Sequence, residues 1–390
     1  MSGDVIYLDY NATTPCDPAV VEAMLPFFSD HAANPSSRAH RPGQKAATAV
    51  EDARQMMARC LHAGSPSEIV FTAGATEANN LALYGAARAL TRHGRHLVTQ
   101  VTEHPAVIEP LRRLEREGWE LTVVGVDAEG RVRPEQVLSA VRDDTVLVSL
   151  MLANNETGAV QPIAEIAAEL GRSEALLHCD AAQAVGKIAI DVRELEIDLL
   201  SFSAHKFYGP KGVGGLYLRR SHPPLQVEAQ TIGGGQESGL RSGTVNVPGV
   251  VGMARALEIA VDRLAGETSR ISGLRDRLER HLLEELEGVS VNGPIHHRLP
   301  GTSNLSFAGV EANALLVSLP DLAFSTGSAC TSTHSEPSPV LNAMGVSRDL
   351  AAASIRLGVG RFTTEADVEQ AGGRIIEEVR RLRALKRKGR

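Results

Sequence analysis

The sequence has few cysteines and few long apolar runs, and each shortage excludes a class of protein. Cysteine occurs four times in 390 residues, at Cys16, Cys60, Cys179 and Cys330, and no two have the C-x-x-C spacing. That pattern argues against a zinc site and against a disulfide framework. No apolar run reaches the roughly 18 residues of a membrane span, and the first residues lack the features of a signal peptide. We therefore expect a cytoplasmic protein without membrane contact.

An excess of basic residues is also absent. The net charge of −7 at pH 7 argues against direct nucleic-acid binding. Residues 380–390 are locally basic, and we interpret them as a solvated helix end, although they also fit a pathway linked to nucleic acid. The hydrophobic content of 43% is enough for a large core, and the chain length predicts two domains.

Strand and helix patterns alternate from about residue 68 to residue 218. The apolar runs 145–150 and 175–178 are typical of strands buried on both faces of a parallel sheet. From residue 247 to about 287 the helical period is not interrupted by a strand, which predicts a long helix leading into a second domain. We expect an α/β chain with a large, mostly parallel-sheet domain over 16–262. Residues 1–15 and 263–390 would form a smaller α+β domain.

Lys206 follows the apolar run 199–202 and precedes a Gly/Pro turn, which places it where a strand leaves the sheet. Ser203 and His205 flank it as possible hydrogen-bond donors. A lysine held near such donors and partly buried is suited to Schiff-base chemistry. An ordinary solvated loop lysine is the usual alternative, so support has to come from elsewhere in the chain.

Three other groups of residues provide that support. Gly74 to Glu77 lie where a strand turns into a helix, so that free N–H groups beside Thr76 predict a phosphate site; an N-cap at Thr76 is the structural alternative. Asp180 ends an apolar strand and Gln183 follows it, placed for a ring nitrogen and a phenolic oxygen; a capping aspartate is the alternative. His104 begins a helix where its ring can stack on a flat ligand, and a structural histidine is the alternative.

Phosphate site, stacking histidine, carboxylate and lysine occur in that chain order, and together they are the parts of a pyridoxal phosphate site. At these residues the chain resembles the fold-type I pyridoxal phosphate enzymes, and within them the cysteine desulfurases of the NifS/IscS class. The resemblance covers nearly the whole chain. Its motifs lie at residues 7–15, 71–77, 102–104, 153–158, 180–187, 205–206, 241–244, 327–332 and 354–356.

The resemblance implies a role for each of these residues. Lys206 would hold pyridoxal 5′-phosphate and move protons, Asp180 would keep the ring nitrogen protonated, and His104 would stack on the ring and shuttle protons. Gln183 would donate to the phenolic oxygen. The phosphate would be held by Ala75, Thr76, Ser203, His205 and, from the partner subunit of a homodimer, Thr244. Asn155, which we also expect beside the cofactor, and Arg356 would bind the substrate carboxylate.

Cys330 lies in a run of small polar residues, where a thiol is accessible, whereas Cys60 and Cys179 lie in helix-like and strand-like segments and should be core residues. The resemblance makes Cys330 the nucleophile that takes sulfur from L-cysteine, giving L-alanine and a persulfide for acceptor proteins of iron–sulfur assembly, tRNA thiolation or DNA sulfur modification. No resident metal is expected, although Cys330 could share a transient iron–sulfur cluster with a scaffold. An aminotransferase or lyase acting on another amino acid is the alternative activity, and a non-catalytic scaffold is a third interpretation.

Two details of the sequence refine the resemblance. The segment of about 325–338 is similar to the long-loop group, whose loop carries sulfur outward. Ala204 stands where glycine is common before the His-Lys pair, and we therefore predict a negative φ at Ala204. Housekeeping members extend beyond the position of Arg390, in a region that helps to dock the scaffold, which leaves the acceptor open.

Overall fold

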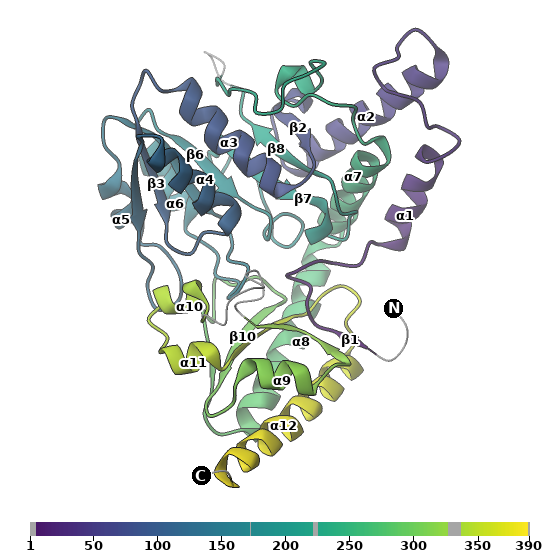
Figure 1. Ribbon diagram of the computed structural model, residues 1–390. Coiled ribbons are helices and arrows are strands. Elements are labelled where there is room, and N and C mark those ends of the chain that lie inside the picture. The colour runs from purple at the N-terminus through teal and green to yellow at the C-terminus, as the bar shows by residue number, and fades with distance from the viewer. Residues whose placement is uncertain (1–4, 172, 221–224, 327–336, 389–390) are drawn as a thin grey trace.

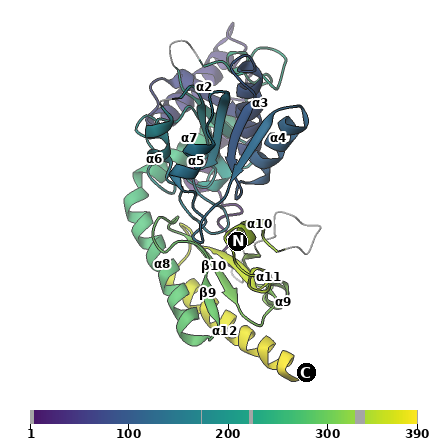
Figure 2. The ribbon, with the colours of Figure 1, turned by 90° about the vertical axis from the view of Figure 1, so that its left-hand side faces the viewer.

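The computed structural model describes residues 5–171, 173–220, 225–326 and 337–388. Two sheets lie one above the other, and helix α8 runs down from the upper part along the lower one (Figures 1 and 2). The upper part holds a seven-stranded sheet with the strand order β2-β8-β7-β6-β5-β3-β4. The lower part holds a four-stranded sheet with the order β12-β13-β10-β9.

The large sheet is mostly parallel, as the apolar runs predicted. Its strands are β2 (Ile69–Thr72), β3 (His96–Gln100), β4 (Glu120–Val124), β5 (Thr145–Met151), β6 (Leu176–Asp180), β7 (Leu199–Ser203) and β8 (Gly214–Leu218). The neighbouring pairs among β3 to β7 are parallel, whereas β8 is antiparallel to both β7 and β2. Because parallel strands end at the same edge, β6 and its neighbours present their carboxyl ends together.

Helices cover both faces of this sheet. One face packs on α3 (Ala75–Ala89) and α4 (Pro105–Arg116), and the other on α2 (Arg41–Cys60), α6 (Ile163–Leu170) and α7 (Val247–Asp262). The shorter elements of this part are α1 (Pro18–Met24), α5 (Pro134–Ala140) and the single turns η1 (Leu25–Phe27), η2 (Pro66–Glu68), η3 (Ala204–Lys206) and η4 (Glu237–Gly239). A sheet covered on both faces explains why its strands are apolar throughout rather than alternating.

The lower sheet is antiparallel and has its own core. It consists of β9 (Val289–Val291), β10 (Thr302–Phe307), β12 (Ser325–Thr326) and β13 (Ser354–Gly358). Its helices are α8 (Leu264–Glu285), α9 (Ala312–Ser318), α10 (Pro339–Ala343), α11 (Arg348–Ala352) and α12 (Glu365–Lys388). The N-terminal strand β1 (Ile6–Tyr7) pairs with β11 (Leu322–Ala323), and Ile6 and Leu8 are buried in this lower core. The domain limits at residues 16 and 262 stay a prediction.

The long helix expected over 247–287 is two helices that meet at Arg263. There the backbone leaves the helical ladder, with φ −96° and ψ −3°. The two halves bury side chains in different cores: Met253 and Leu257 of α7 belong to the core of the large sheet, and Leu274 and Leu278 of α8 to that of the small sheet. The periodic pattern indicates that each half has an apolar stripe. It does not indicate that the two stripes pack against different cores.

The cysteines and the apolar segments complete the comparison with the sequence. Cys179 is fully buried as predicted, whereas Cys60 at the end of α2 is half-buried at the edge of the core. Among the described residues, no helix is long and apolar enough to cross a membrane.

Candidate active site

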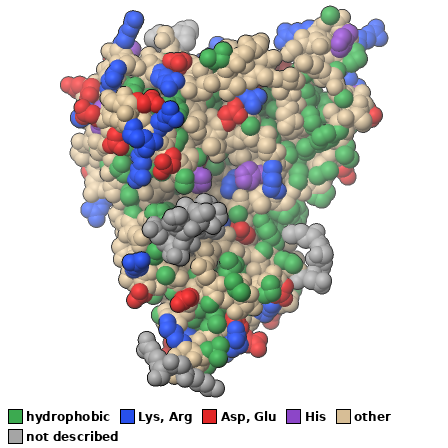
Figure 3. Space-filling view, viewed as in Figure 1, with side chains coloured by type: hydrophobic (Ala, Val, Ile, Leu, Met, Phe, Trp, Pro, Cys, Tyr) green, Lys and Arg blue, Asp and Glu red, His purple; other side chains and the backbone are tan. Residues whose placement is uncertain are grey.

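A cavity of about 1060 Å³ lies between the two sheets, at the carboxyl ends of the large sheet's parallel strands. Lys, Arg and His side chains form a row across the middle of the face seen in Figure 3, at the level where the two parts meet. Ten of the predicted site residues line the cavity: Ala75, Thr76, His104, Asn155, Asp180, Gln183, Ser203, His205, Lys206 and Arg356. Residues up to 281 positions apart, such as Ala75 and Arg356, are therefore brought into one site.

The start of α3 forms one wall of this cavity. The N-cap is Gly74, with φ 156° and no capping side chain, rather than Thr76, so the capping alternative at Thr76 is wrong. The first N–H groups of an uncapped helix have no backbone acceptor and carry partial positive charge, which favours an anion. A Cβ placed on Gly74 would lie 3.7 Å from Ser203 Oγ, so the predicted phosphate-binding hydroxyl is next to the helix start.

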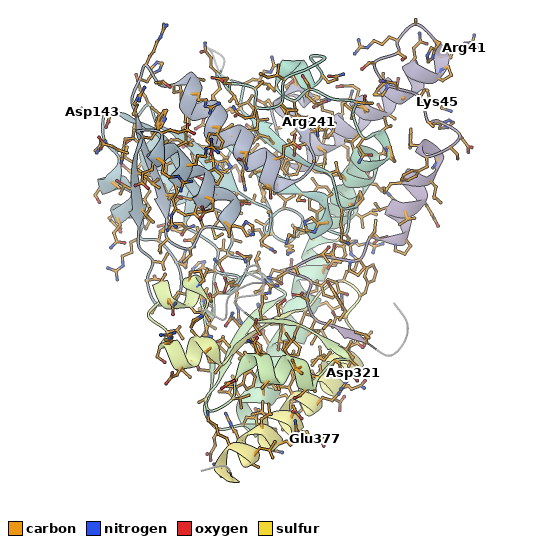
Figure 4. The ribbon with its side chains drawn as sticks, viewed as in Figure 1. Arg41, Lys45, Asp143, Arg241, Asp321 and Glu377 are labelled. Atoms are coloured by element: carbon orange, nitrogen blue, oxygen red, sulfur yellow. The ribbon has the colours of Figure 1, made fainter. Side chains whose placement is uncertain are left out.

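A half-buried ion pair adjoins this wall. Glu77 accepts from the N–H of Ala73 at 2.9 Å and pairs with Arg241 at 2.7 Å. Arg241, labelled in Figure 4, also lines the cavity. The carboxylate of Glu77 therefore neutralises a guanidinium that belongs to a predicted motif.

Asp180 is held by two hydrogen bonds at the end of β6. Its Oδ1 accepts from the N–H of Ala182 at 2.9 Å, and its Oδ2 accepts from Asn79 Nδ2 at 2.8 Å. Asn79 lies fully buried in α3, and the sequence pattern indicates no role for it beyond the first helical turn. The signal in the sequence was the place of Asn79 near the start of a helix that leads into the site. Its hydrogen-bond partner, Asp180, lies 101 residues further along the chain.

Glu103 lies beside Asp180 and was not predicted as a site residue. It is 7% exposed, and its Oε1 accepts from Gln100 Nε2 at 3.0 Å and from the N–H of Met151 at 2.5 Å. Burial, followed by the charge of Asp180, raises the pKa of Glu103 to about 8. Glu103 is therefore mostly protonated at neutral pH.

His104 is the N-cap of α4, and this fixes its tautomer. Its Nδ1 accepts from the N–H of Ala106 at 3.0 Å, so the ring proton of the neutral form is on Nε2. Burial lowers the pKa of His104; Asp180 opposes that effect and Lys206 adds to it. The site therefore holds a neutral, oriented imidazole, which suits stacking and proton transfer.

Lys206 ends the single turn η3, directly after β7. Its Nζ donates to the carbonyl oxygens of Asn11 and Ala12 at 2.7 and 2.9 Å. Burial and then Lys206 lower the pKa of the neighbouring His205 to about 4, so that this ring is neutral as well. The predicted negative φ at Ala204 is confirmed; positive φ occurs instead at Tyr208, at 68°.

Arg356 enters the cavity from the small sheet. Its Nη2 pairs with Asp9 at 2.8 Å and its Nη1 donates to the carbonyl oxygen of Asn155 at 3.1 Å, while its buried Nε has no hydrogen-bond partner among the described residues. Asp9 was not predicted as a site residue, although it lies in one of the motifs. A 5% exposed guanidinium with an unused donor is suited to a carboxylate ligand.

One described site residue, Thr244, lies outside this cavity, and one predicted site residue is not described. Thr244 is exposed and does not line it. Cys330 lies outside the described residues, and Ser325, which begins the strand before that segment, does line the cavity.

Comparison with known proteins agrees with this geometry. The family model "Aminotransferase class-V" matches residues 6–371. The chain is 52% identical over 380 residues to the cysteine desulfurase IscS of Anaeromyxobacter dehalogenans (strain 2CP-C), covering 97% of this chain and 94% of that protein. The solved structure of a "NIFS-LIKE PROTEIN" superposes with a TM-score of 0.90 at 39% identity, covering 96% of this chain and 99% of that one.

A second solved structure, "SspA in complex with cysteine", superposes with a TM-score of 0.81 at 37% identity and covers 92% of this chain and 99% of its own. The residues present fit pyridoxal phosphate: an uncapped helix start for the phosphate, a carboxylate held by two donors for the ring nitrogen, a neutral histidine and a lysine amine. The chain belongs to the class-V aminotransferase family, among its cysteine desulfurases, and its cofactor is pyridoxal phosphate.

Proposed function

We propose that this chain removes sulfur from L-cysteine, releasing L-alanine and leaving the sulfur as a persulfide on Cys330. The observation that carries the proposal is the meeting, in one cavity, of Lys206 and Asp180 from the large sheet with Arg356 from the small one. Pairing between β12 and β13 sets Ser325 directly opposite Arg356. Cys330 is five residues further along the chain, a span of at most about 17 Å when extended.

Each protein group has a separate task in this reaction. The cofactor, when bound, withdraws electrons from the α-carbon of the amino acid. Asp180, held by one donor on each carboxylate oxygen, would favour a protonated ring nitrogen. Lys206 Nζ would hold the cofactor and move protons, and His104 Nε2 would carry the second transferable proton.

Arg356 positions the substrate. Its unused Nε and the Nη2 now paired with Asp9 form a two-pronged donor for the amino acid carboxylate, and Asn155 lines the same space. The thiolate of Cys330 then attacks the substrate sulfur, so that an S–S bond forms as the C–S bond breaks. The carbon left behind takes up a proton and leaves as alanine, which balances cysteine plus thiol against alanine plus persulfide.

Replacing Cys330 tests the proposal directly. Cys330→Ala holoenzyme should keep its bound yellow cofactor and lose alanine formation from cysteine. Cys16→Ala, which changes a half-buried thiol on another part of the chain, is the matched control and should keep the activity. Undiminished alanine formation by Cys330→Ala would refute the assigned role.

Two alternatives make different predictions for the same proteins. An aminotransferase or lyase acting on another amino acid would not need Cys330, and turnover of cysteine, selenocysteine and alanine separates those activities. A scaffold without catalysis would lack the cofactor absorbance in pure protein. The lysine, carboxylate and histidine in one cavity support the enzyme over the scaffold.

We also propose a homodimer in which Thr244 enters the partner's site. Thr244 is exposed and outside its own cavity, while Gln230, Thr231 and Arg241 of the same region line that cavity. Ile232, between them, is 89% exposed, as an apolar side chain covered by a second copy would be. The exposed position of Thr244 is thus compatible with a role in a neighbouring subunit.

A mixture of two inactive chains tests this sharing. Lys206→Ala removes a subunit's own amine, and Thr244→Asp places a negative charge against the phosphate of its partner. Random mixed dimers contain one intact site in half of the dimers, so about a quarter of the wild-type activity should return. Absence of any recovery in verified mixed dimers would refute a Thr244 contribution in trans.

The sulfur acceptor and the cellular location stay predictions. Trapping with persulfidated Cys330, followed by identification of the protein that removes the sulfur, would separate an iron–sulfur scaffold from thiolation enzymes. Cell fractionation measures the expected cytoplasmic location.

A further inference from the structure

Lys187 is a half-buried lysine whose amine none of the roles above uses. It lies in the turns after β6, four residues beyond Gln183, where side chains meet on the same side of a helical turn. Its Nζ donates to Gln183 Oε1 at 2.7 Å. Gly186, with φ 75°, turns the chain just before it, and a Cβ there would lie 2.7 Å from Phe207 Cβ. Glycine thus permits the tight turn and the close approach to Phe207 just before this lysine.

The amide of Gln183 is held from both ends. Its Nε2 donates to the carbonyl oxygen of Asn11 at 2.8 Å, and the same oxygen accepts from Lys206 Nζ at 2.7 Å. A carbonyl only accepts hydrogen bonds and an ammonium group only donates them. The oxygen of the Gln183 amide therefore faces Lys187, and its NH₂ group faces the Lys206 side of the cavity.

The surroundings of Lys187 are unfavourable for a cation, which argues that stability alone does not account for it. Among the described residues, no carboxylate lies within ion-pair distance of its amine, and Glu267 only shares with it the lining of a cavity of about 30 Å³. Burial, then the charges of Lys206 and Arg356, lower the pKa of Lys187 to about 7. Its charge also lowers the pKa of His205. A partly desolvated amine without an acid partner costs free energy.

We propose that Lys187 is a positioning residue that holds the Gln183 amide with its N–H donors toward the phenolic oxygen of pyridoxal phosphate. The inference rests on the proposed role of Gln183. If the amide turned over, its oxygen would face the phenolic oxygen, and two acceptors would oppose each other. Protonated Lys187 opposes that orientation because an ammonium group has no acceptor to offer the amide NH₂, and it acts together with the Asn11 carbonyl, which only accepts.

The bound cofactor's absorbance reports this orientation without substrate. A donor on the phenolic oxygen stabilises the negative charge of that oxygen. Lys206 Nζ, when joined to the cofactor, therefore releases its proton at lower pH. Loss of the donor should raise the pH midpoint of the absorbance change. Lys187→Met holoenzyme should show a rise of about one pH unit, the order expected for one hydrogen bond to a charged group.

A double-mutant cycle separates positioning from charge. Gln183→Leu should raise the midpoint by a similar amount, and Lys187→Met added to it should raise the midpoint no further. Lys187→Arg, which keeps a charged donor, should stay near the wild-type midpoint. Lys386→Met, an exposed lysine on α12, is the control for lost charge and should change nothing.

Each outcome has one meaning. A full additional shift in the Gln183→Leu background would show that Lys187 acts through its charge, and no shift in Lys187→Met would also overturn the inference. No shift in Gln183→Leu would instead refute the proposed role of Gln183, and the inference would fall with it. Lys187→Gln replaces Lys187→Met if the latter cannot be isolated with cofactor.

Discussion

The charge at the base of the site is set by two neighbouring carboxyl groups in different surroundings. Asp180 accepts from two donors, one on each oxygen, whereas Glu103 has an Oε2 without a hydrogen-bond partner among the described residues. Both groups accept two hydrogen bonds, but those of Glu103 both fall on Oε1, and burial followed by the charge of Asp180 favours its neutral form. Glu103 therefore acts as a buried acid whose ionisation is postponed to about pH 8.

The postponed ionisation predicts a stability that falls with pH. The folded-state pKa of Glu103, about 8, lies above the ordinary 4.5, so its contribution is fully present below about pH 4.5 and lost as the pH rises through about 8. Glu103→Gln removes this loss. The Tm of the variant minus the Tm of wild type should therefore be larger at pH 9 than at pH 6, by about 2 °C or more.

Glu115→Gln is the matched control for this measurement. Glu115 is an exposed acid on α4, and its replacement should leave the pH dependence of Tm unchanged. A difference between wild type and Glu103→Gln that stayed constant from pH 6 to pH 9 would contradict a late ionisation of Glu103.

For single residues, the sequence predicts the functional residues that lie in recognisable motifs. It misses the residues that hold those functional side chains in place. Lys206, Asp180 and His104 stand at strand and helix ends in a chain order typical of the family, so their residue types and positions were sufficient. Asn79 and Asp9 each serve a partner that is distant in sequence, Asp180 and Arg356, and neither contact follows from local pattern. Such residues can be identified only from the tertiary structure.

Among the elements, the start of α3 depends most on a single residue. Gly74 has φ 156°, a conformation that side-chain-bearing residues rarely adopt, and this opens the turn that leaves the helix N–H groups toward the cavity. Space is not the constraint, since a Cβ would meet only Ser203 Oγ, at 3.7 Å. The requirement for glycine lies in the backbone.

Gly74→Ala should therefore weaken both the fold and the hold on phosphate. The strain of the backbone predicts a loss of about 1–3 kcal/mol in the free energy of unfolding. A displaced helix start predicts pyridoxal phosphate binding weakened by roughly tenfold, the equivalent of about 1.4 kcal/mol. Urea unfolding and titration of the apoenzyme with the cofactor measure the two effects.

Gly273→Ala provides the contrast within the same chain. Gly273 lies inside α8, and a Cβ added there would have nothing within 4 Å, so alanine should raise stability by about 0.5–1 kcal/mol. If Gly74→Ala behaved like Gly273→Ala, the helix start would not depend on the backbone of Gly74.

The sequence predicts most elements because each has an apolar pattern of its own, and it fails where two patterns adjoin. The strands 145–150 and 175–178 agree with the structure to within two residues. The sequence predicts one helix over 247–287 because both halves have the same period. The residue where they meet, Arg263, is not a helix-breaking glycine or proline. Which core each half meets is a property of the tertiary structure.

At the scale of the whole molecule, one buried arginine ties the two parts together behind the site. Arg361, 8% exposed, pairs with Asp17 at the start of α1 at 2.8 Å and with Glu267 of α8 at 2.7 Å. Its guanidinium carbon lies 4.1 Å from the centre of the Tyr208 ring, and its backbone N–H donates to the Tyr208 hydroxyl at 2.6 Å. Tyr208 is two residues beyond Lys206, so this cluster also supports the turn that follows the lysine.

Breaking the cluster should therefore loosen the junction and the site together. Arg361→Leu leaves the buried carboxylate of Asp17 and the half-buried one of Glu267 without their partner, a loss of about 3–5 kcal/mol in the free energy of unfolding. Arg277→Leu removes an equally short pair, with Glu365, but an exposed one, and should cost no more than about 1 kcal/mol in urea unfolding. Cofactor release should also become faster in Arg361→Leu alone, because only this arginine of the two contacts the turn beyond Lys206. Equal losses of unfolding free energy in the two variants would mean that burial does not strengthen the contribution of the Arg361 cluster.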